Sequence, residues 1–131
     1  MRINRETDYA IRIVLCLASH NRRISAREIA VEMKITHAFA LKILHKLNNN
    51  GFVASEQGVA GGYVLLRHPK TISLLDIVEV IDGPIAINLC LQEGSSCERL
   101  EKTQCPVHNT LYGLNDVIRK EMGMCKISSL I

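Results

Sequence analysis

Tryptophan is absent from the chain, and two phenylalanines and three tyrosines bring the aromatic fraction to only 4% of 131 residues. Proteins that bind RNA or single-stranded DNA stack the bases on several exposed aromatic side chains. This composition argues against that class of protein. We therefore expect any contact with nucleic acid to be made in a groove of duplex DNA.

Long apolar runs are also lacking. The run over residues 11–18 is interrupted by Arg12, whereas about 20 apolar residues are needed to cross a bilayer. The first eight residues carry both charge signs and no small-residue cleavage site, which is unlike a secretory signal. We expect a cytoplasmic protein with no membrane partner. Five cysteines, an odd number, then favour metal or redox chemistry over structural disulfides.

The charge is unevenly distributed along a chain of ordinary globular composition, with 47% apolar and 22% charged residues. Up to Lys70 there are eleven Lys and Arg against five Asp and Glu, and after Lys70 there are five against eight. This segregation suggests that the N-terminal part faces a polyanion. An ordinary solvated basic surface would give the same count.

Apolar spacing predicts three helices in the first fifty residues. The first runs from Thr7 to residue 18, and the second starts after Ser25, where Glu28 completes a capping box. The third starts after Thr36 and ends in the stretch 48–51. A short helix, a tight turn and a longer helix are typical of a helix-turn-helix.

Residues 52–57 and 63–67 then have the pattern of two strands, joined by a loop with glycines at positions 58, 61 and 62. A hairpin that follows a helix-turn-helix is a wing, although a plain surface hairpin would look the same. The glycines would let the backbone approach a phosphate closely. Ser73, with Asp76 three residues later, predicts a further helix that ends near Gly83.

The fold class is therefore mainly α with a small β-hairpin wing. We expect a winged helix-turn-helix domain over residues 1–83, a loop over 84–104, and a long C-terminal helix with its tail over 105–131. Because winged-helix proteins often bind two half-sites as dimers, we interpret the last helix as a homodimerisation helix; packing on its own domain is the alternative. Its apolar stripe consists of Leu111, Leu114, Val117, Ile118 and Met122.

Three of the five cysteines and a histidine form the pattern C-x6-C-x7-C-x2-H. They are Cys90, Cys97, Cys105 and His108. Three thiolates and an imidazole suit an iron–sulfur cluster. The spacing also allows structural zinc or a thiol redox switch, but zinc sites usually contain a short C-x2–4-C pair, which this segment lacks.

The other candidate residues carry weaker signals. We expect Cys16 to be a small core residue and Cys125 to be an oxidisable thiol outside the site. The histidines at positions 20, 37, 45 and 68 have no metal-ligand spacing and are expected at the surface or facing DNA. No nucleophile, base and orienting group occur together, so we do not expect an enzyme.

These residues together resemble the IscR/NsrR/RirA-like family of winged-helix transcription regulators, over nearly the whole chain. The matching segments are residues 1–3, 8–10, 35–39, 42–44, 58–65, 67–69, 72–74 and 76–78, followed by the cysteine loop. The resemblance implies a cytoplasmic bacterial homodimer with crossed C-terminal helices. It also implies control of genes for iron–sulfur assembly, iron supply, nitric-oxide defence or cysteine metabolism.

In cluster-bearing members of this family three loop cysteines ligate the cluster, which implies Cys90, Cys97 and Cys105 here. The fourth ligand is His108 in one branch, or Asp8 from the partner subunit in a branch with a four-iron cluster. A two-iron and a four-iron cluster both stay open. The expected function is a DNA-binding transcription regulator whose operator affinity is controlled by the cluster. The alternative is an iron-free regulator of the same fold that senses thiols or metabolites.

For DNA, the third helix would enter the major groove and the wing would approach the adjacent groove or backbone. Many relatives carry arginine just before the wing glycines; this chain has Gln57, so we expect weaker minor-groove readout. Lys42, Lys46 and Arg67 are the expected phosphate contacts. The full set of expected DNA-binding residues is His37, Ala38, Lys42, His45, Lys46, Gln57, Gly61, Gly62, Tyr63 and Arg67.

Overall fold

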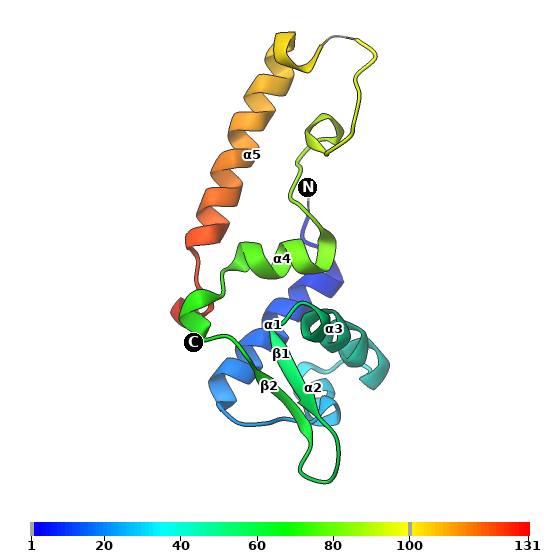
Figure 1. Ribbon diagram of the computed structural model, residues 1–131, viewed down its shortest axis with the longest axis vertical. Coiled ribbons are helices and arrows are strands. Elements are labelled where there is room, and N and C mark those ends of the chain that lie inside the picture. Colours follow the sequence, from blue (N-terminus) through cyan, green and yellow to red (C-terminus); the bar gives the residue numbers. More distant parts are fainter. Residues whose placement is uncertain (1, 100) are drawn as a thin grey trace.

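The computed structural model describes residues 2–99 and 101–131. Four helices and a hairpin form a winged domain, and a loop and a long helix extend from it (Figure 1). The elements are α1 (Arg5–His20), α2 (Ala26–Met33), α3 (His37–Asn49), β1 (Val53–Glu56), β2 (Gly62–Leu65), α4 (Leu74–Asp82) and α5 (Pro106–Met124). Short 3-10 turns lie at Pro69–Thr71, Leu89–Leu91, Lys102–Gln104 and Ile127–Ser129. The predicted winged helix-turn-helix with a long C-terminal helix is confirmed.

The helix starts follow local capping residues. The side chains of Ser25 and Thr36 each accept a backbone N–H from the first turn of α2 and α3. Ser73 and Asp76 form a complete capping box at the start of α4. Helix α1 begins at Arg5, two residues before the predicted start, because the side chain of Asn4 caps it.

The expected capping box of α2 is only half formed. Ser25 Oγ accepts the backbone N–H of Glu28 at 3.1 Å, but the Glu28 carboxylate pairs with Arg22 at 2.5 Å. A full charge on Arg22 competes successfully with the backbone N–H of the cap residue. The capping box therefore predicts where the helix starts and not the partner of its glutamate.

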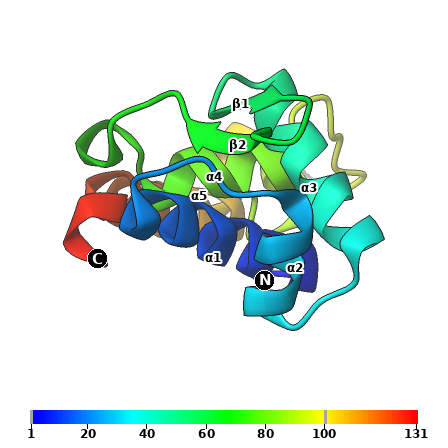
Figure 2. The ribbon, with the colours of Figure 1, turned by 90° about the horizontal axis from the view of Figure 1, so that it is seen from below.

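The core of the winged domain lies where α1, α3, α4 and the hairpin meet. Figure 2 shows α2 and α3 on one flank of the domain, with the hairpin next to α3. The largest fully buried side chains are Phe52, Ile13, Ile24, Ile29, Ile43, Leu44, Leu47, Ile72, Ile77, Ile127, Val14 and Val53. Seven of them lie on helices α1 to α4.

Ile127 joins this core from the far end of the chain. Its side chain is 0% exposed, and its backbone N–H donates to the carbonyl of Ile72 at 2.9 Å. The backbone N–H of Leu74 in turn donates to the carbonyl of Cys125 at 3.0 Å. Full burial of an isoleucine contributes about 1.5–3 kcal/mol. The end of α5 is therefore fastened to the winged domain.

Most of α5 stands away from the winged domain (Figure 1). Among its described residues, only Asn115 is buried. Within the predicted apolar stripe, Leu111, Ile118 and Met122 are half-buried, whereas Leu114 is 51% and Val117 is 56% exposed. Part of the stripe is thus uncovered within one chain. No helix in the described ranges is long and apolar enough to cross a membrane.

The wing is a two-stranded antiparallel hairpin whose register pairs Val53 with Leu65 and Glu56 with Gly62. Its strands are shorter than the predicted 52–57 and 63–67, since the ends curve into the connecting loops. The backbone of Tyr63 exchanges two hydrogen bonds with Ile24, of 2.7 and 3.0 Å. These bonds tie the hairpin to the segment that links α1 and α2.

Gly62 allows this close approach. Its φ is +141°, and a Cβ at this position would lie 2.6 Å from the carbonyl oxygen of Ile24. We predict that Gly62→Ala lowers the free energy of unfolding by about 1–3 kcal/mol, because it combines backbone strain with a backbone clash. Chemical denaturation measures the change.

Gly113→Ala in α5 is the matched control. A Cβ there meets nothing within 4 Å, and alanine has the higher helix propensity, so no loss of stability is expected. Equal effects of the two substitutions would contradict the proposed role of Gly62.

Candidate DNA-binding surface and cysteine cluster

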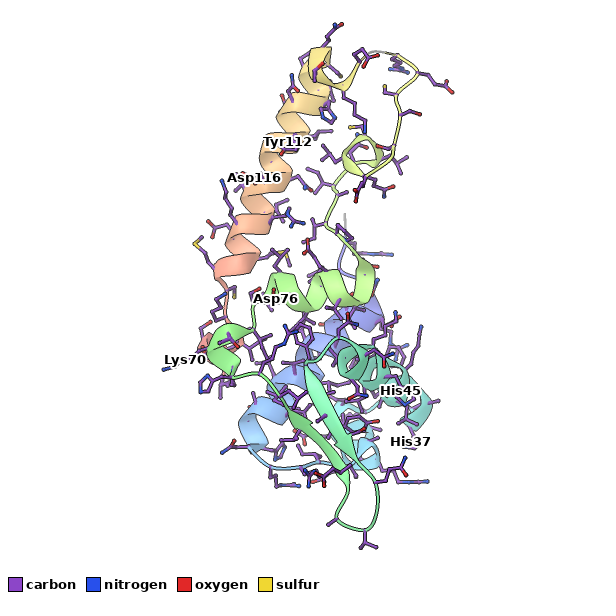
Figure 3. All side chains as sticks on the ribbon, viewed as in Figure 1. His37, His45, Lys70, Asp76, Tyr112 and Asp116 are labelled. Atoms are coloured by element: carbon purple, nitrogen blue, oxygen red, sulfur yellow. The ribbon has the colours of Figure 1, made fainter. Side chains whose placement is uncertain are left out.

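One side of α3 is buried and the other is open to solvent. Ala40, Ile43, Leu44 and Leu47 pack into the core. The opposite side exposes four of the expected DNA-binding residues, His37, Ala38, Lys42 and His45. Figure 3 shows His37 and His45 on the outer flank of the winged domain. In helix-turn-helix proteins, the second helix lies in the major groove.

Aromatic contacts with α1 brace the start of α3. The rings of Tyr9 and Phe39 meet edge to face, with centroids 5.8 Å apart. The Arg5 guanidinium lies 5.6 Å from the Tyr9 centroid and 5.5 Å from that of Phe39. Such contacts each contribute roughly 0.5–1 kcal/mol at exposed sites. They help to set the orientation of α3 on α1.

Two expected phosphate contacts are paired with α1. The Glu6 carboxylate lies 3.0 Å from Lys42 Nζ and 2.6 Å from Lys46 Nζ. Burial alone would raise the pKa of Glu6, but hydrogen bonds and charge from Lys46 and Lys42 outweigh it and lower this pKa. The Lys42 side chain is 60% exposed. Lys46 is less exposed and also donates to the carbonyl of Ile81.

Arg67 supports the turn after α3. Its Nε donates to the carbonyl of Gly51 at 3.1 Å and its Nη2 to the carbonyl of Asn50 at 2.9 Å. The guanidinium lies 4.1 Å from the centroid of the Phe52 ring. The structure therefore gives this expected phosphate contact an internal role, since these bonds tie the segment after β2 to the turn between α3 and β1.

The wing residues divide into an exposed tip and a buried base. Gln57 and the loop residues 58–60 are exposed, and Gly61 and Gly62 are half-buried. Tyr63, by contrast, is only 9% exposed and belongs to the hydrophobic core. Alternation along β2 turns its side chain inward. Tyr63 therefore anchors the wing to the core.

Three of the expected cluster ligands gather at the start of α5. Cys105 is the N-cap of the helix, and its Sγ accepts the backbone N–H of His108 at 3.4 Å. The Nδ1 atom of His108 lies 3.4 Å from the Sγ of Cys90. Asn88 Nδ2, which the sequence did not single out, donates to the same sulfur at 3.3 Å. Helix α5 thus brings residues from both ends of the loop together.

The other two expected ligands are Cys97 and Asp8. Cys97 is exposed, in a depression that Ser95 and Lys102 also line. Asp8 lies on α1, where its carboxylate pairs with Arg12 at 3.1 Å. Within the described residues, no contact joins Asp8 to Cys90, Cys105 or His108.

Asn115 is a further residue that sequence reasoning missed. Its side chain accepts the backbone N–H of Ile87 and donates to the carbonyl of Ile85, both at 3.0 Å. A buried amide that satisfies two backbone groups fixes the path of a loop. An isolated polar residue beside an apolar stripe is the signal that could have revealed it. One turn further, Arg119 of α5 pairs with Glu79 of α4.

A helix-turn-helix with an exposed second helix and a glycine-rich wing defines a winged helix-turn-helix DNA-binding protein. The family model Rrf2, described as an iron-dependent transcriptional regulator, matches residues 3–131. The chain belongs to this family, whose members are transcription regulators and not enzymes.

Two curated relatives match over most of the chain. An HTH-type transcriptional regulator of Aquifex aeolicus is 30% identical over 124 residues, which cover 94% of this chain and 86% of that protein. Protein aau3 of Rhizobium meliloti is 31% identical over 124 residues, with coverages of 94% and 75%.

Solved structures share the fold. A transcriptional regulator from Listeria innocua has a TM-score of 0.81 at 28% identity, covering 99% of this chain and 85% of that chain. CymR, the global cysteine regulator of B. subtilis, has a TM-score of 0.81 at 23% identity, with coverages of 99% and 95%. IscR of T. potens has a TM-score of 0.74 at 19% identity, with coverages of 99% and 85%.

Proposed function

We propose that this DNA-binding transcription regulator senses iron or redox state through an iron–sulfur cluster bound at residues 84–104 and the start of α5. The observation that carries the proposal is the meeting of Cys90, Cys105 and His108 at the N-terminus of α5. The thiol and imidazole donors suit iron in a cluster. The positive end of the helix dipole favours an anionic group there.

The donor set fits a cluster better than a single ion. Among the described residues, no three donor atoms of this loop lie within 4.8 Å of one another, the kind of separation that one ion requires. A cluster spans several atoms and accepts more widely spaced ligands. Cys97, on an exposed part of the loop, would complete the set. His108 fits the fourth position because it already contacts Cys90, whereas Asp8 would have to come from the partner subunit.

The iron-free alternative rests on the exposure of Cys97. An exposed thiol suits redox chemistry or thiol sensing. Similarity in fold to CymR, the global cysteine regulator of B. subtilis, also fits the iron-free alternative. Measurement of the cofactor distinguishes the two regulators.

The DNA interface that we propose consists of the outer side of α3 and the wing tip. His37, Ala38 and His45 face the bases of the major groove, and Lys42 turns from Glu6 to a phosphate. Gln57, Gly61 and Gly62 bring the wing backbone to the neighbouring strand. Lys46 and Arg67 would contact phosphates only by giving up bonds to Glu6, Gly51 and Asn50, so they act mainly by positioning α3.

A second copy of the chain covers the exposed side of α5 in this proposal. Leu114 and Val117 form the centre of the uncovered stripe. A homodimer would bury them and present two α3 helices to two half-sites.

The loop communicates with the winged domain through α5. Asn115 holds residues 85 and 87, Arg119 pairs with Glu79 on α4, and α4 packs against α1 and α3. Ligation by the loop cysteines would reshape the loop and so shift α4 and the two α3 helices of the dimer. A coupling of about 1–3 kcal/mol is enough for a useful switch.

We predict that Lys42→Ala weakens binding to a random-sequence DNA duplex and lowers the slope of log affinity against log salt by about two, since each subunit of the proposed homodimer loses one phosphate contact. Fluorescence anisotropy at several salt concentrations measures both effects. Lys120→Ala removes another exposed lysine, which pairs with Asp116 on α5. The control should keep the wild-type slope; a wild-type slope for Lys42→Ala as well would refute the phosphate contact.

We expect Leu114→Glu to dissociate the homodimer, because it places a charge in the centre of the apolar interface. Sedimentation velocity reports the mass. Leu114 is exposed in the single chain, so the variant should keep its helical circular dichroism. Lys120→Glu adds negative charge to α5 outside the apolar stripe and should remain dimeric. A wild-type protein that sediments as a monomer would contradict the proposed dimer interface.

Protein purified without oxygen should show visible absorption, with iron and acid-labile sulfide in matching amounts. Cys97→Ser should abolish the chromophore and change the affinity for DNA, because one of three thiolate ligands is lost. Cys125→Ser, which lies after α5, should retain both properties. Wild-type protein that stays colourless after anaerobic reconstitution would favour the iron-free regulator.

A further inference from the structure

A second set of metal-ligating side chains lies in the winged domain. Cys16 and His20 belong to α1 and Glu32 to α2. Their sulfur, nitrogen and oxygen donor atoms lie within 4.8 Å of one another, which no other set of three among the described residues does. The Nε2 atom of His20 is 2.9 Å from a carboxylate oxygen of Glu32. The start of α5 lies in the other part of the molecule, on the far side of α4 (Figure 1).

The local sequence explains why these residues meet. Cys16 and His20 are four residues apart, so a single helix places them on the same side. Helix α2 packs against α1 and brings Glu32 beside them. The inner ligand, Cys16, is 5% exposed, whereas the His20 and Glu32 side chains are about one-third to two-fifths exposed. The set is therefore closed on the core side and open on the solvent side.

A surface depression leads to this set. It has a volume of about 450 Å³, and Cys16 and Glu32 lie in its wall together with Ser19 and Met33. An ion can therefore reach the sulfur from solvent without opening the core. A water molecule has room to complete the coordination from the same side.

The donor chemistry selects the kind of ion. Magnesium and calcium prefer oxygen ligands alone. A thiolate, an imidazole and a carboxylate suit zinc, with distances from metal to ligand of about 2.0–2.3 Å. Ligand atoms within 4.8 Å need only small side-chain rotations to reach such a geometry.

We propose that Cys16, His20 and Glu32 bind one divalent transition-metal ion of the zinc class, with water in the fourth position. Three protein ligands and one open position are a common arrangement for zinc. The ion bridges α1 and α2 and thus fastens the first helix of the helix-turn-helix to the scaffold. Because α2 packs against α3, the bound ion stabilises the DNA-binding domain independently of the cysteine loop.

The test uses the full chain with Cys90, Cys97 and Cys105 replaced by serine, so that the loop cannot bind the probe. Cobalt(II) is titrated in, since thiolate ligation produces a charge-transfer absorption band. We expect one cobalt per chain, displacement by zinc, and a higher melting temperature with zinc bound.

Single substitutions in this background assign the ligands. Cys16→Ala should abolish the charge-transfer band, whereas Cys125→Ala, a matched cysteine outside the set, should retain it. Glu32→Gln and His20→Gln should each weaken cobalt binding at least about tenfold. Both of these residues lie at the surface, so a failure to fold is not expected, and circular dichroism checks the fold.

Three outcomes would overturn the proposal: no cobalt band with Cys16 present, a band that survives Cys16→Ala, or unchanged affinity in both Glu32→Gln and His20→Gln. His20 and Glu32 would then be a plain surface pair beside a core thiol. The site does not depend on the cluster, so a colourless wild-type protein would leave this proposal standing.

Discussion

The chain returns to the winged domain after α5, and the position of α5 and of the cysteine loop depends on this return. Ile127 fills a place in the core and bonds to the backbone of Ile72, more than fifty residues earlier. Without this anchor, α5 would be joined to the domain mainly through the Glu79–Arg119 pair and the contacts of α4. With it, α5 is a rigid arm whose far end receives Cys90, Cys105 and His108. In the proposed mechanism, this arm transmits a change at the cysteine site to the helices of the winged domain.

Several charged residues of the winged domain form ion pairs and hydrogen bonds within the domain. Glu6 holds Lys42 and Lys46 against α1, and Arg67 holds the turn after α3. These pairs keep α3 oriented while DNA is absent. A phosphate that takes Lys42 from Glu6 exchanges one anionic partner for another, so part of the attraction to DNA is offset. Lys42 is more exposed than Lys46, which makes this exchange easier for Lys42.

Local signals predicted most of the elements, because capping and periodicity act over a few residues. Ser25, Thr36 and Ser73 each begin a helix in the structure. The sequence also placed Cys90, Cys105 and His108 in one site, and the structure brings these three together. It did not predict that Asn115 would hold the start of the loop, since the path of a loop depends on such distant anchors. Nor did it predict the inward orientation of Tyr63, which follows from a hydrogen-bonded bridge to Ile24.

The sequence by itself determined the winged helix-turn-helix, the exposed outer side of α3, the glycine-rich wing and the resemblance to a known family. These features arise from residues that are close in the chain, through caps, helical spacing and glycine geometry. The tertiary structure alone decided which lysines pair with Glu6, that Arg67 supports a turn, and that Glu32 lies beside Cys16 and His20. Each of these contacts joins residues that are far apart in the chain or on different elements, and only the packing of helices brings such residues within a few ångströms.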